Sequence, residues 1–189
     1  MQFYPPNTIV PNEKRTDRLL LRPLRATDVE QDYDAVMSSA EMLRRWSQSA
    51  WPSDDFTLKQ NLDDLERHER EHTERVAFTF TVVEPHGSRC LGCVYMTPLW
   101  PPEVQICPNA RYAANVSFWV RASEVSTELN QHLLATLLDW LRAEWAFDYL
   151  VFPIGQDNER QAALFQEAGI ERRVGFSSPD QQRQWQVFS

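Results

Sequence analysis

The sequence DNERQAALFQEAGI, residues 157–170, is the stretch from which the fold of this chain can be worked out. It predicts a helix, because Asp157 and Asn158 are both good N-cap residues and Gly169 suits the left-handed position that ends a helix. The preceding run DYLVFPI, residues 148–154, is mostly apolar and typical of a buried strand. The segments that follow predict a final pair of strands, 171–176 and 183–188.

The segment before this β-α-β unit predicts another strand and a long helix. YAANVSFWVR, residues 112–121, has the β-branched and aromatic content of a strand. Residues 124–145 predict a helix. Its broad apolar stripe is formed by Leu129, Leu133, Leu134, Leu137, Leu138 and Leu141.

The N-terminal part begins with an extended segment. Residues 1–14 contain three prolines and predict an arm, and the apolar run 18–24 predicts a strand. Thr27 and Glu30 have capping-box spacing and predict the start of a helix. The buried face of this helix is expected to run through Val29, Tyr33 and Val36.

The next segment predicts a second helix and a hairpin. A loop leads to a helix over residues 57–74. Two β-rich runs, 76–83 and 89–97, flank a Pro-His-Gly-Ser turn and predict a β-hairpin.

The predicted elements follow the order β-α-α-β-β-β-α-β-α-β-β. A hairpin at the front and a β-α-β unit at the back indicate an α+β domain, with a mixed, mostly antiparallel sheet flanked by helices. The length of 189 residues suits one domain. We place this domain at residues 15–189, after the arm at 1–14.

The composition argues against several function classes. Acidic residues outnumber Lys plus Arg by 27 to 19, so there is no general basic footprint for nucleic acid. No apolar run has the length of a membrane span, and the N-terminus lacks the core of a signal peptide. Three cysteines are too few for a disulfide framework. We expect a cytoplasmic protein that binds neither nucleic acid nor membrane.

Four segments resemble the GNAT superfamily of N-acetyltransferases, most closely the branch that acetylates ribosomal-protein N-termini. They are TDRLLLRPLRATDVE, NVSFWVR, LLATLLDWL and DNERQAALFQEAGI. The last is similar to the family pattern N-x-x-(small)-x-x-L-(aromatic)-x-x-x-G-(apolar), with Asn158, Leu164, Phe165 and Gly169 in register. The order and spacing of the segments carry the resemblance over nearly the whole chain.

The resemblance implies where acetyl-CoA would bind. In the family two central strands splay apart around the pantetheine arm, and the matching strands here are 113–121 and 148–154. Backbone N–H groups near Trp119 and Val120 would hold the thioester carbonyl. Asn158 matches a residue that contacts the pantetheine arm, although it also fits a plain N-cap. The implied reaction is attack by an amine, which needs a proton acceptor and donors for the oxyanion.

Residues 125–130, VSTELN, depart from the family's pyrophosphate loop. The family pattern is (Gln/Arg)-x-x-Gly-x-(Gly/Ala), and both small residues are absent here. Small residues let backbone N–H groups approach a phosphate, whereas Glu128 adds negative charge. Two interpretations stay open. Either Ser126 or Thr127 is an ordinary N-cap, or the hydroxyls of Ser126 and Thr127 and the amide of Asn130 replace the backbone donors.

The positions of two catalytic groups also differ from the family. Many relatives carry a glutamate where Asn115 stands, and an amide cannot act as a base at neutral pH. Many carry a tyrosine acid where Phe165 stands. The sequence therefore identifies no catalytic residue.

Two loops lie near the expected site. Trp46 and Trp51 lie in a loop that lines the acceptor site in relatives, where aromatic rings suit an apolar or cationic ligand. The alternative is that both rings pack over the edge of the core. The proline-rich loop 98–112 lies beside the splay and is either a lid or a homodimer contact.

Two short motifs suggest metal ligands. HEREH, residues 68–72, fits the H-E-x-x-H zinc motif, but charges surround it and no third ligand follows at a family spacing. We interpret it as a solvated, ion-paired helix end. Cys90 and Cys93 lie on a predicted strand, where residues three apart face opposite sides unless Gly92 forms a bulge. We therefore expect no metal site.

Two functions remain open. The first is an N-acyltransferase that moves an acyl group from acyl-CoA to an amine of a small molecule or a peptide N-terminus, with an altered cofactor loop. The second is a non-catalytic member of the fold that has lost acetyl-CoA binding and acts as a binding or partner module.

Overall fold

One sheet of eight strands organises the part of the chain that the computed structural model describes, residues 3–125, 128–178, 180 and 182–189. The strand order is β1-β2-β3-β4-β5-β6-β8-β7. The strands are β1 (Lys14–Arg15), β2 (Leu20–Pro23), β3 (Phe78–Val83), β4 (Cys90–Thr97), β5 (Ala113–Val120), β6 (Tyr149–Gly155), β7 (Arg172–Ser177) and β8 (Gln184–Phe188). All neighbours are antiparallel except β5 and β6. The predicted α+β fold with a mixed, mostly antiparallel sheet is confirmed.

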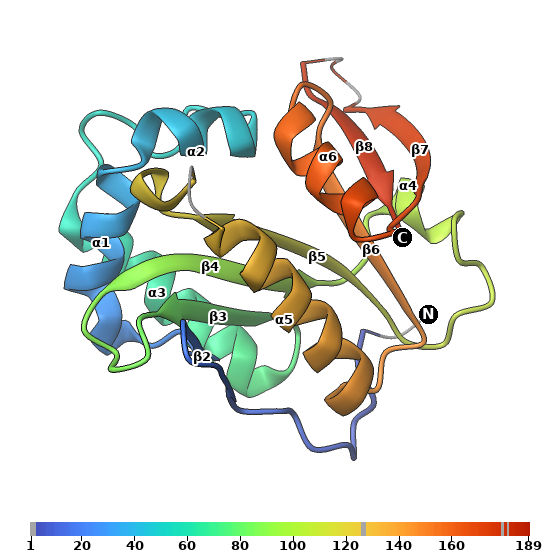
Figure 1. Cartoon of the computed structure of the whole chain (residues 1–189), viewed down its shortest axis with the longest axis horizontal. Helices are drawn as coiled ribbons and strands as arrows, with labels where there is room; N and C mark the ends of the chain where they lie inside the picture. The colour runs from blue at the N-terminus through green and yellow to red at the C-terminus, as the bar shows by residue number, and fades with distance from the viewer. Residues whose placement is uncertain (1–2, 126–127, 179, 181) are drawn as a thin grey trace.

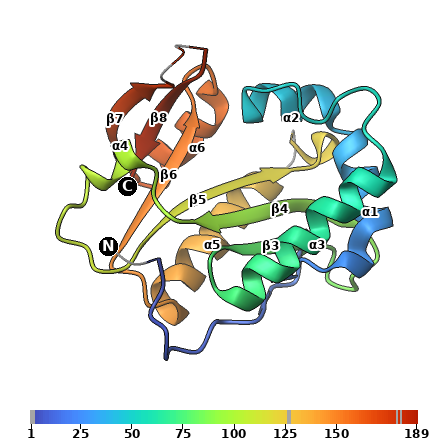
Figure 2. The same cartoon turned by 180° about the vertical axis from the view of Figure 1, so that it is seen from behind.

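Helices cover both faces of the sheet (Figures 1 and 2). They are α1 (Val29–Met37), α2 (Ala40–Ser47), α3 (Leu58–Glu74), α4 (Pro101–Val104), α5 (Leu129–Glu144) and α6 (Glu159–Glu167), with 3-10 turns η1 (Ala26–Asp28) and η2 (Ala122–Glu124). Helices α5 and α6 lie on one face, and α1 and α3 lie on the other. In the described residues no helix combines the length and the apolar character that crossing a membrane requires.

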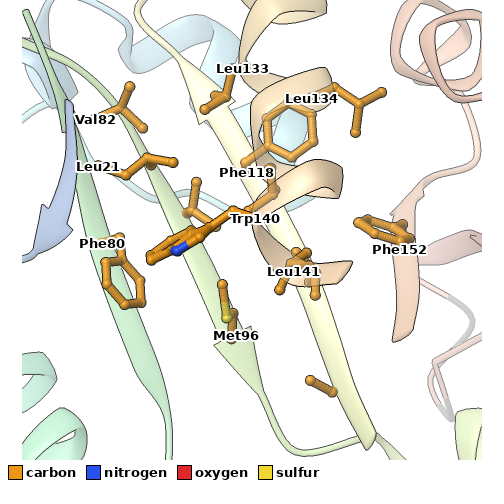
Figure 3. Close-up of a cluster of buried hydrophobic side chains, with 14 of the residues drawn as sticks. Leu21, Phe80, Val82, Met96, Phe118, Leu133, Leu134, Trp140, Leu141 and Phe152 are labelled. Carbon is orange, nitrogen blue, oxygen red and sulfur yellow. The ribbon is translucent and has the colours of Figure 1, made fainter. Parts of the chain in front are cut away.

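The main hydrophobic core lies between α5 and the sheet (Figure 3). The predicted leucine stripe supplies Leu133, Leu134 and Leu137, which are almost fully buried. Trp140 is also fully buried, and its ring centroid lies 5.1 Å from that of Phe80 on β3. Burying side chains of this size stabilises the fold by about 1.5–3 kcal/mol each. This packing fixes the N-terminus of α5 beside the end of β5.

The parallel strands β5 and β6 separate soon after they meet. Their pairing covers only Ala113–Asn115 on β5, where Asn115 pairs with Val151. Beyond this point β6 pairs with β8 instead, from Phe152 to Gly155. Figure 1 shows the two strands diverging as they approach the N-terminal ends of α5 and α6. The splay that the family resemblance implied is present.

The N-terminal segments differ from the prediction at two points, and they show one contact that the sequence does not predict. Thr27 and Glu30 form no capping box, because η1 precedes α1 and Asp28 takes the N-cap position of α1. The Asp28 carboxylate instead accepts a hydrogen bond from the Arg25 N–H at 3.0 Å. The loop expected around Trp46 contains a further helix, α2. The arm is docked on the domain, since Tyr4 is buried within the main core.

Strand β4 contains a bulge at Gly92. Val82 pairs with Gly92 whereas Val83 pairs with Cys90, so Leu91 is an extra residue. A Cβ atom at Gly92 would lie 2.1 Å from the Trp119 carbonyl oxygen, which leaves room only for glycine. A bulge shifts the alternation of side chains along a strand. Cys90 and Cys93 therefore face the same side of the sheet, within the cluster beneath α1.

Candidate active site

A cavity of about 850 Å³ opens where β5 and β6 separate. Strand β5 lines it with Phe118, Trp119 and Val120, and β6 lines it with Gly155. Helices contribute further lining residues, among them Trp46, Asn130, Gln131, Asn158, Gln161 and Leu164. The structure thus brings together four predicted cofactor contacts, Trp119, Val120, Asn130 and Asn158, around one space.

The backbone of β5 faces the cavity at alternate residues. The Arg121 N–H donates to a β4 carbonyl at 2.7 Å, so Arg121 and Trp119 direct their backbone groups toward β4. Phe118 and Val120 direct theirs into the gap. Accordingly, the Phe118 carbonyl accepts a hydrogen bond from the Gln161 side chain of α6 at 3.3 Å. Of the two residues expected to offer N–H groups, Val120 has that orientation, whereas Trp119 lines the cavity without directing its backbone there.

Among the described polar side chains around the cavity, Gln48 has an unpaired amide donor. Asn158 is the N-cap of α6, and its Oδ1 accepts from the Gln161 N–H at 3.2 Å. Gln48 follows α2, and its Oε1 accepts from the Gln184 N–H at 3.0 Å. The Gln48 Nε2 atom is buried and has no partner among the described residues. A Cβ on Gly155 would lie 3.2 Å from this Nε2. An orphaned donor beside a cavity fits a ligand that carries carbonyl or phosphate oxygens.

The N-terminus of α5 presents a carboxylate to the cavity. Glu128 is the N-cap of α5 and lies 3.4 Å from Arg18. One of the two open interpretations places Ser126 or Thr127 at this cap, but Glu128 occupies the N-cap position, and Ser126 and Thr127 lie outside the described part of the chain. The charged side chains recorded in the cavity lining are two basic and three acidic, Arg45, Arg160, Glu128, Asp157 and Glu167. The described lining thus carries no excess of positive charge for a phosphate.

A buried carboxylate lies at the point where the strands separate. The Asn115 Nδ2 donates to both carboxylate oxygens of Glu103, at 3.1 and 3.2 Å. The Trp100 N–H donates to the same carboxylate at 2.8 Å. Glu103 is 0% exposed. Burial raises the pKa of Glu103 to about 7, although these donors act to lower it.

The sequence does not identify Glu103 as a site residue, because the proline-rich segment 98–112 predicts only a loop. Residues 101–104 form the short helix α4, which places Glu103 against β5. A signal was present, since proline at the first turn of a helix followed by a glutamate is typical of a helix start. It indicates a turn, but it does not indicate which way the carboxylate points.

Trp46 and Trp51 occupy different surroundings. Trp46 lines the cavity, and its ring centroid lies 6.0 Å from that of Tyr95 on β4. The Tyr95 hydroxyl also accepts a hydrogen bond from the Trp119 indole at 3.1 Å. Trp51 packs 6.2 Å from Phe56, measured between ring centroids, and is not among the cavity-lining residues described. The packing alternative describes Trp51, whereas Trp46 is placed to touch a ligand.

A second buried polar group lies beneath α1. Possible ligand atoms of Asp32, Cys90 and Cys93 lie within 4.8 Å of one another, the one such group found among the described residues. The Cys93 thiol donates to Asp32 Oδ1 at 3.6 Å, and the Asn61 amide donates to Asp32 Oδ2 at 3.0 Å. Burial raises the pKa of Asp32 to about 6. Asp32 thus accepts hydrogen bonds from both Cys93 and Asn61, which holds the group together.

The two histidines of HEREH face the sheet. The His68 ring lies 5.7 Å from the Tyr95 ring, and the His72 ring lies 5.1 Å from that of Phe78. Ion pairs such as Arg67 to Glu71, at 3.3 Å, do form on the outer side of α3. The prediction of a solvated helix end is therefore wrong for the histidines, which are half-buried. Neither belongs to a group of metal-ligand side chains within the described residues.

Solved structures with this fold include several acetyltransferases. A ribosomal-protein alanine acetyltransferase from Vibrio fischeri matches with a TM-score of 0.72 and 14% identity, over 94% of this chain and 95% of that one. An acetyltransferase from Salmonella typhimurium that modifies the N-terminal serine of a 50S ribosomal subunit protein matches with a TM-score of 0.70 and 12% identity, over 92% and 94%. A microcin self-immunity acetyltransferase in complex with acetyl-CoA and AMP matches with a TM-score of 0.73 and 11% identity, over 92% of both chains.

Sequence comparison gives a more direct assignment than these structural matches. No curated protein sequence matches the chain. The model of the acetyltransferase (GNAT) domain matches residues 18–171. This match begins at β2 and runs through α6, so it includes both splayed strands and the helices beside the cavity. Since it covers most of the chain, the protein belongs to the acetyltransferase (GNAT) domain family.

Proposed function

We propose that this protein transfers an acyl group from acyl-CoA to the amine of a small molecule or of a peptide N-terminus. The cavity between β5 and β6 carries the proposal, because it combines exposed strand backbone, an orphaned amide donor and two helix N-caps around one space. Acetyl-CoA would supply an acetyl thioester there, which an amine attacks at the carbonyl carbon.

The residues of the cavity suggest how the extended arm of such a ligand is held. Backbone groups of Phe118 and Val120 face the gap and offer donors and acceptors to the amides of a pantetheine arm. The Gln48 Nε2 atom offers a further donor. Asn158 and Trp46 extend the lining on opposite sides, toward α6 and α2. A peptide N-terminus is a reasonable acceptor to test, because two structural neighbours act on ribosomal proteins.

The cofactor loop at 125–130 is part of the proposal and is altered relative to the family. Glu128 at the N-cap of α5 repels a pyrophosphate group at the place where backbone donors usually receive one. The Asn130 side chain lines the cavity and offers a neutral donor. We propose that Asn130, together with Ser126 and Thr127, replaces the missing glycine backbone, and that Arg45 and Arg160 bring compensating charge.

The alternative function is a non-catalytic binding or partner module that has lost acetyl-CoA binding. Two observations favour it. Glu128 lines the cavity where an anion is expected, and the Gln161 side chain already occupies the Phe118 carbonyl in the gap. The two functions differ in a single property, which is the affinity of the purified protein for acetyl-CoA.

Calorimetric titration with acetyl-CoA tests the proposal. We expect micromolar binding, and a saturating ligand at about 100 times its dissociation constant should stabilise the protein by about 2.7 kcal/mol. The variant Ala163→Trp places a bulky ring in the cavity lining from the exposed side of α6 and should weaken binding at least about tenfold, or about 1.4 kcal/mol. Gln166→Trp, on the same helix but outside the described lining, is the matched control. Absence of binding at millimolar acetyl-CoA rejects the enzyme and favours the binding module.

A further inference from the structure

Glu103 is a buried carboxylate that the described fold does not compensate with positive charge. Its oxygens accept hydrogen bonds from Asn115 and from the Trp100 N–H, and the described residues form no ion pair with it. The titratable neighbour recorded beside it is the Cys107 thiol, whose pKa is raised by burial and by Glu103. Burying an ionised carboxylate without a cation is costly. A residue that carries such a cost calls for a reason other than stability.

One face of β5 runs from Glu103 to the cavity. Asn115, Ser117 and Trp119 alternate along this face, because side chains two residues apart on a strand point the same way. Asn115 contacts Glu103, and Trp119 lines the cavity. Ser117 lies between them, is half-buried, and pairs with the half-buried Tyr95. Its Cα atom is therefore roughly 7 Å from that of Asn115, so Ser117 lies between the Asn115–Glu103 pair and the cavity.

The chemistry proposed for the cavity lacks a base. An amine is largely protonated at neutral pH and must lose a proton before its lone pair can attack an acyl carbon. The cavity-lining acids Glu128, Asp157 and Glu167 are exposed. Glu103 is the carboxylate placed next to the vertex of the splay, and two asparagine hydrogen bonds hold both of its oxygens in fixed directions.

We infer that Glu103 is the proton acceptor for the attacking amine, with Asn115 as the residue that positions it; this inference rests on the proposed function. The ammonium group loses one N–H proton, which passes along a chain of water molecules beside Ser117 to a Glu103 oxygen, and Glu103 becomes a neutral acid. The nitrogen lone pair then forms the C–N bond while the C–S bond breaks. The thiolate takes the second N–H proton, and Glu103 returns its proton to solvent.

The protonation state agrees with this role. A pKa of about 7 leaves Glu103 half ionised at neutral pH, so it can both accept and release a proton. The groups that face it are the Asn115 amide from β5, the Trp100 N–H from the start of α4, and the Cys107 thiol from the same loop. None of these three groups is a cation, so the midpoint of the titration is set mainly by burial.

The test compares two carboxamide substitutions. Glu103→Gln and Asp32→Asn each replace a buried carboxylate by its amide, and Asp32 lies in the separate group beneath α1. Initial rates are measured from about pH 5.5 to about pH 9 with acetyl-CoA and two peptides, one with a free N-terminal serine and one with a free N-terminal alanine. We expect Glu103→Gln to lower kcat by about 10²-fold or more and to abolish the rise in rate through about pH 7. Asp32→Asn should stay within about threefold of the wild type.

Two further measurements separate the inference from the function on which it rests. Acetyl-CoA binding, measured by calorimetry, should be equal in the wild type and in Glu103→Gln. Infrared difference spectra should show a carboxyl group that titrates near pH 7 in the wild type and is missing in Glu103→Gln. The reciprocal double variant Glu103→Gln with Asn115→Glu restores a carboxylate–amide pair, and it should recover part of the pH-dependent rate. A merely structural pair would recover only stability.

The outcomes are distinct. If the wild type neither binds acetyl-CoA nor acetylates either peptide, the proposed function fails and the inference fails with it. If the wild type is active but Glu103→Gln keeps its kcat and its pH profile, the inference alone is overturned. Lack of a carboxyl group titrating near pH 7 also overturns it. Loss of folding in Glu103→Gln leaves the double variant and the infrared titration of the wild type to decide.

Discussion

Two buried carboxylates, Asp32 and Glu103, make an instructive comparison. Each accepts a hydrogen bond from an asparagine side chain, Asn61 for Asp32 and Asn115 for Glu103. No ion pair forms with either within the described residues, and burial raises the pKa of both, to about 6 and about 7 respectively. Their local chemistry is nearly the same.

Their surroundings differ. Asp32 is enclosed between α1, α3 and β4, where the Cys93 thiol supplies another donor and apolar side chains complete the packing. Glu103 lies where β5 leaves β6, on a strand face that continues to the cavity. Burial and a raised pKa therefore do not identify a functional acid by themselves. The position of the group relative to the place where a substrate can lie makes the distinction.

Gly92→Ala should have the largest effect, and it should disturb the surroundings of Asp32 but not those of Glu103. The added Cβ would lie 2.1 Å from the Trp119 carbonyl oxygen, so β4 and β5 must move apart. We expect a loss of about 3 kcal/mol or more in urea unfolding, as for severe overpacking. Gly175→Ala, with its nearest contact at 3.3 Å, is the control and should cost less than about 1 kcal/mol.

The same variant probes whether the two carboxylates are independent. The bulge at Gly92 is what brings Cys90 and Cys93 onto one face beside Asp32. In Gly92→Ala we expect both thiols to react faster with a thiol reagent, while the carboxyl of Glu103 still titrates near 7. Unchanged thiol reactivity would show that the bulge does not hold the Asp32 group together.

Much of the fold followed from the sequence because local signals and tertiary packing agree there. The leucine stripe of α5, the hairpin of β3 and β4, and the Asn158 cap of α6 appear where their patterns predict them. Thr57 likewise begins α3, with its hydroxyl accepting from the Gln60 N–H at 3.2 Å. These features depend on residues that are close together in the sequence.

The parts that could not be predicted depend on contacts between distant residues. Asp28 replaces Thr27 as the cap because Arg22 on β2 pairs with it at 2.7 Å. Glu103 and Asn115 are separated by a loop whose course no local pattern specifies. From the sequence, a bulge at Gly92 was only one of two possibilities. The contact that requires glycine there, with the Trp119 carbonyl, comes from a different strand. The candidate site therefore emerged mainly from the structure.

The pH dependence of stability should distinguish Asp32 from Glu103. An acid whose pKa is higher in the folded state binds more protons when folded, so its contribution to stability is lost as pH rises through the folded pKa. The window is about pH 4 to 6 for Asp32 and about 4.5 to 7 for Glu103. Since one pKa unit corresponds to about 1.4 kcal/mol, each group should lower the free energy of unfolding by about 3 kcal/mol at pH values above its window.

Asp32→Asn and Glu103→Gln isolate the two windows. Each variant should match the wild type near pH 4 and exceed its stability by up to about 3 kcal/mol near pH 8, as measured by urea unfolding. His68 and His72 have lowered pKa values, mainly through burial, and so contribute stability that rises with pH. Their contribution cancels when each variant is compared with the wild type. A difference that does not change with pH would contradict a raised pKa at that site.

Removing the asparagine partners should have a smaller effect. In Asn115→Ala the Glu103 carboxylate keeps the hydrogen bond from the Trp100 N–H. In Asn61→Ala the Asp32 carboxylate keeps the hydrogen bond from the Cys93 thiol, and the Val29 carbonyl loses its side-chain donor. Each should cost about 2 kcal/mol, the penalty for a poorly satisfied buried group. The loss should be greater near pH 8 than near pH 5, because the carboxylates are ionised at the higher pH. Only Asn115→Ala should also change the rate of acyl transfer.

The smallest expected effect is a difference in ligand affinity between variants of Trp46 and Trp51, to which the sequence assigns the same role. Trp46 lines the cavity, whereas Trp51 packs on Phe56 away from the described lining. Trp46→Ala should weaken the binding of coenzyme A by about fivefold, close to 1 kcal/mol, because it removes one apolar wall. Trp51→Ala should leave that affinity unchanged and lower only the stability. Fluorescence titration of both variants measures the difference, since Trp119 remains in the cavity as a reporter. Equal affinities in the two variants would place coenzyme A away from α2.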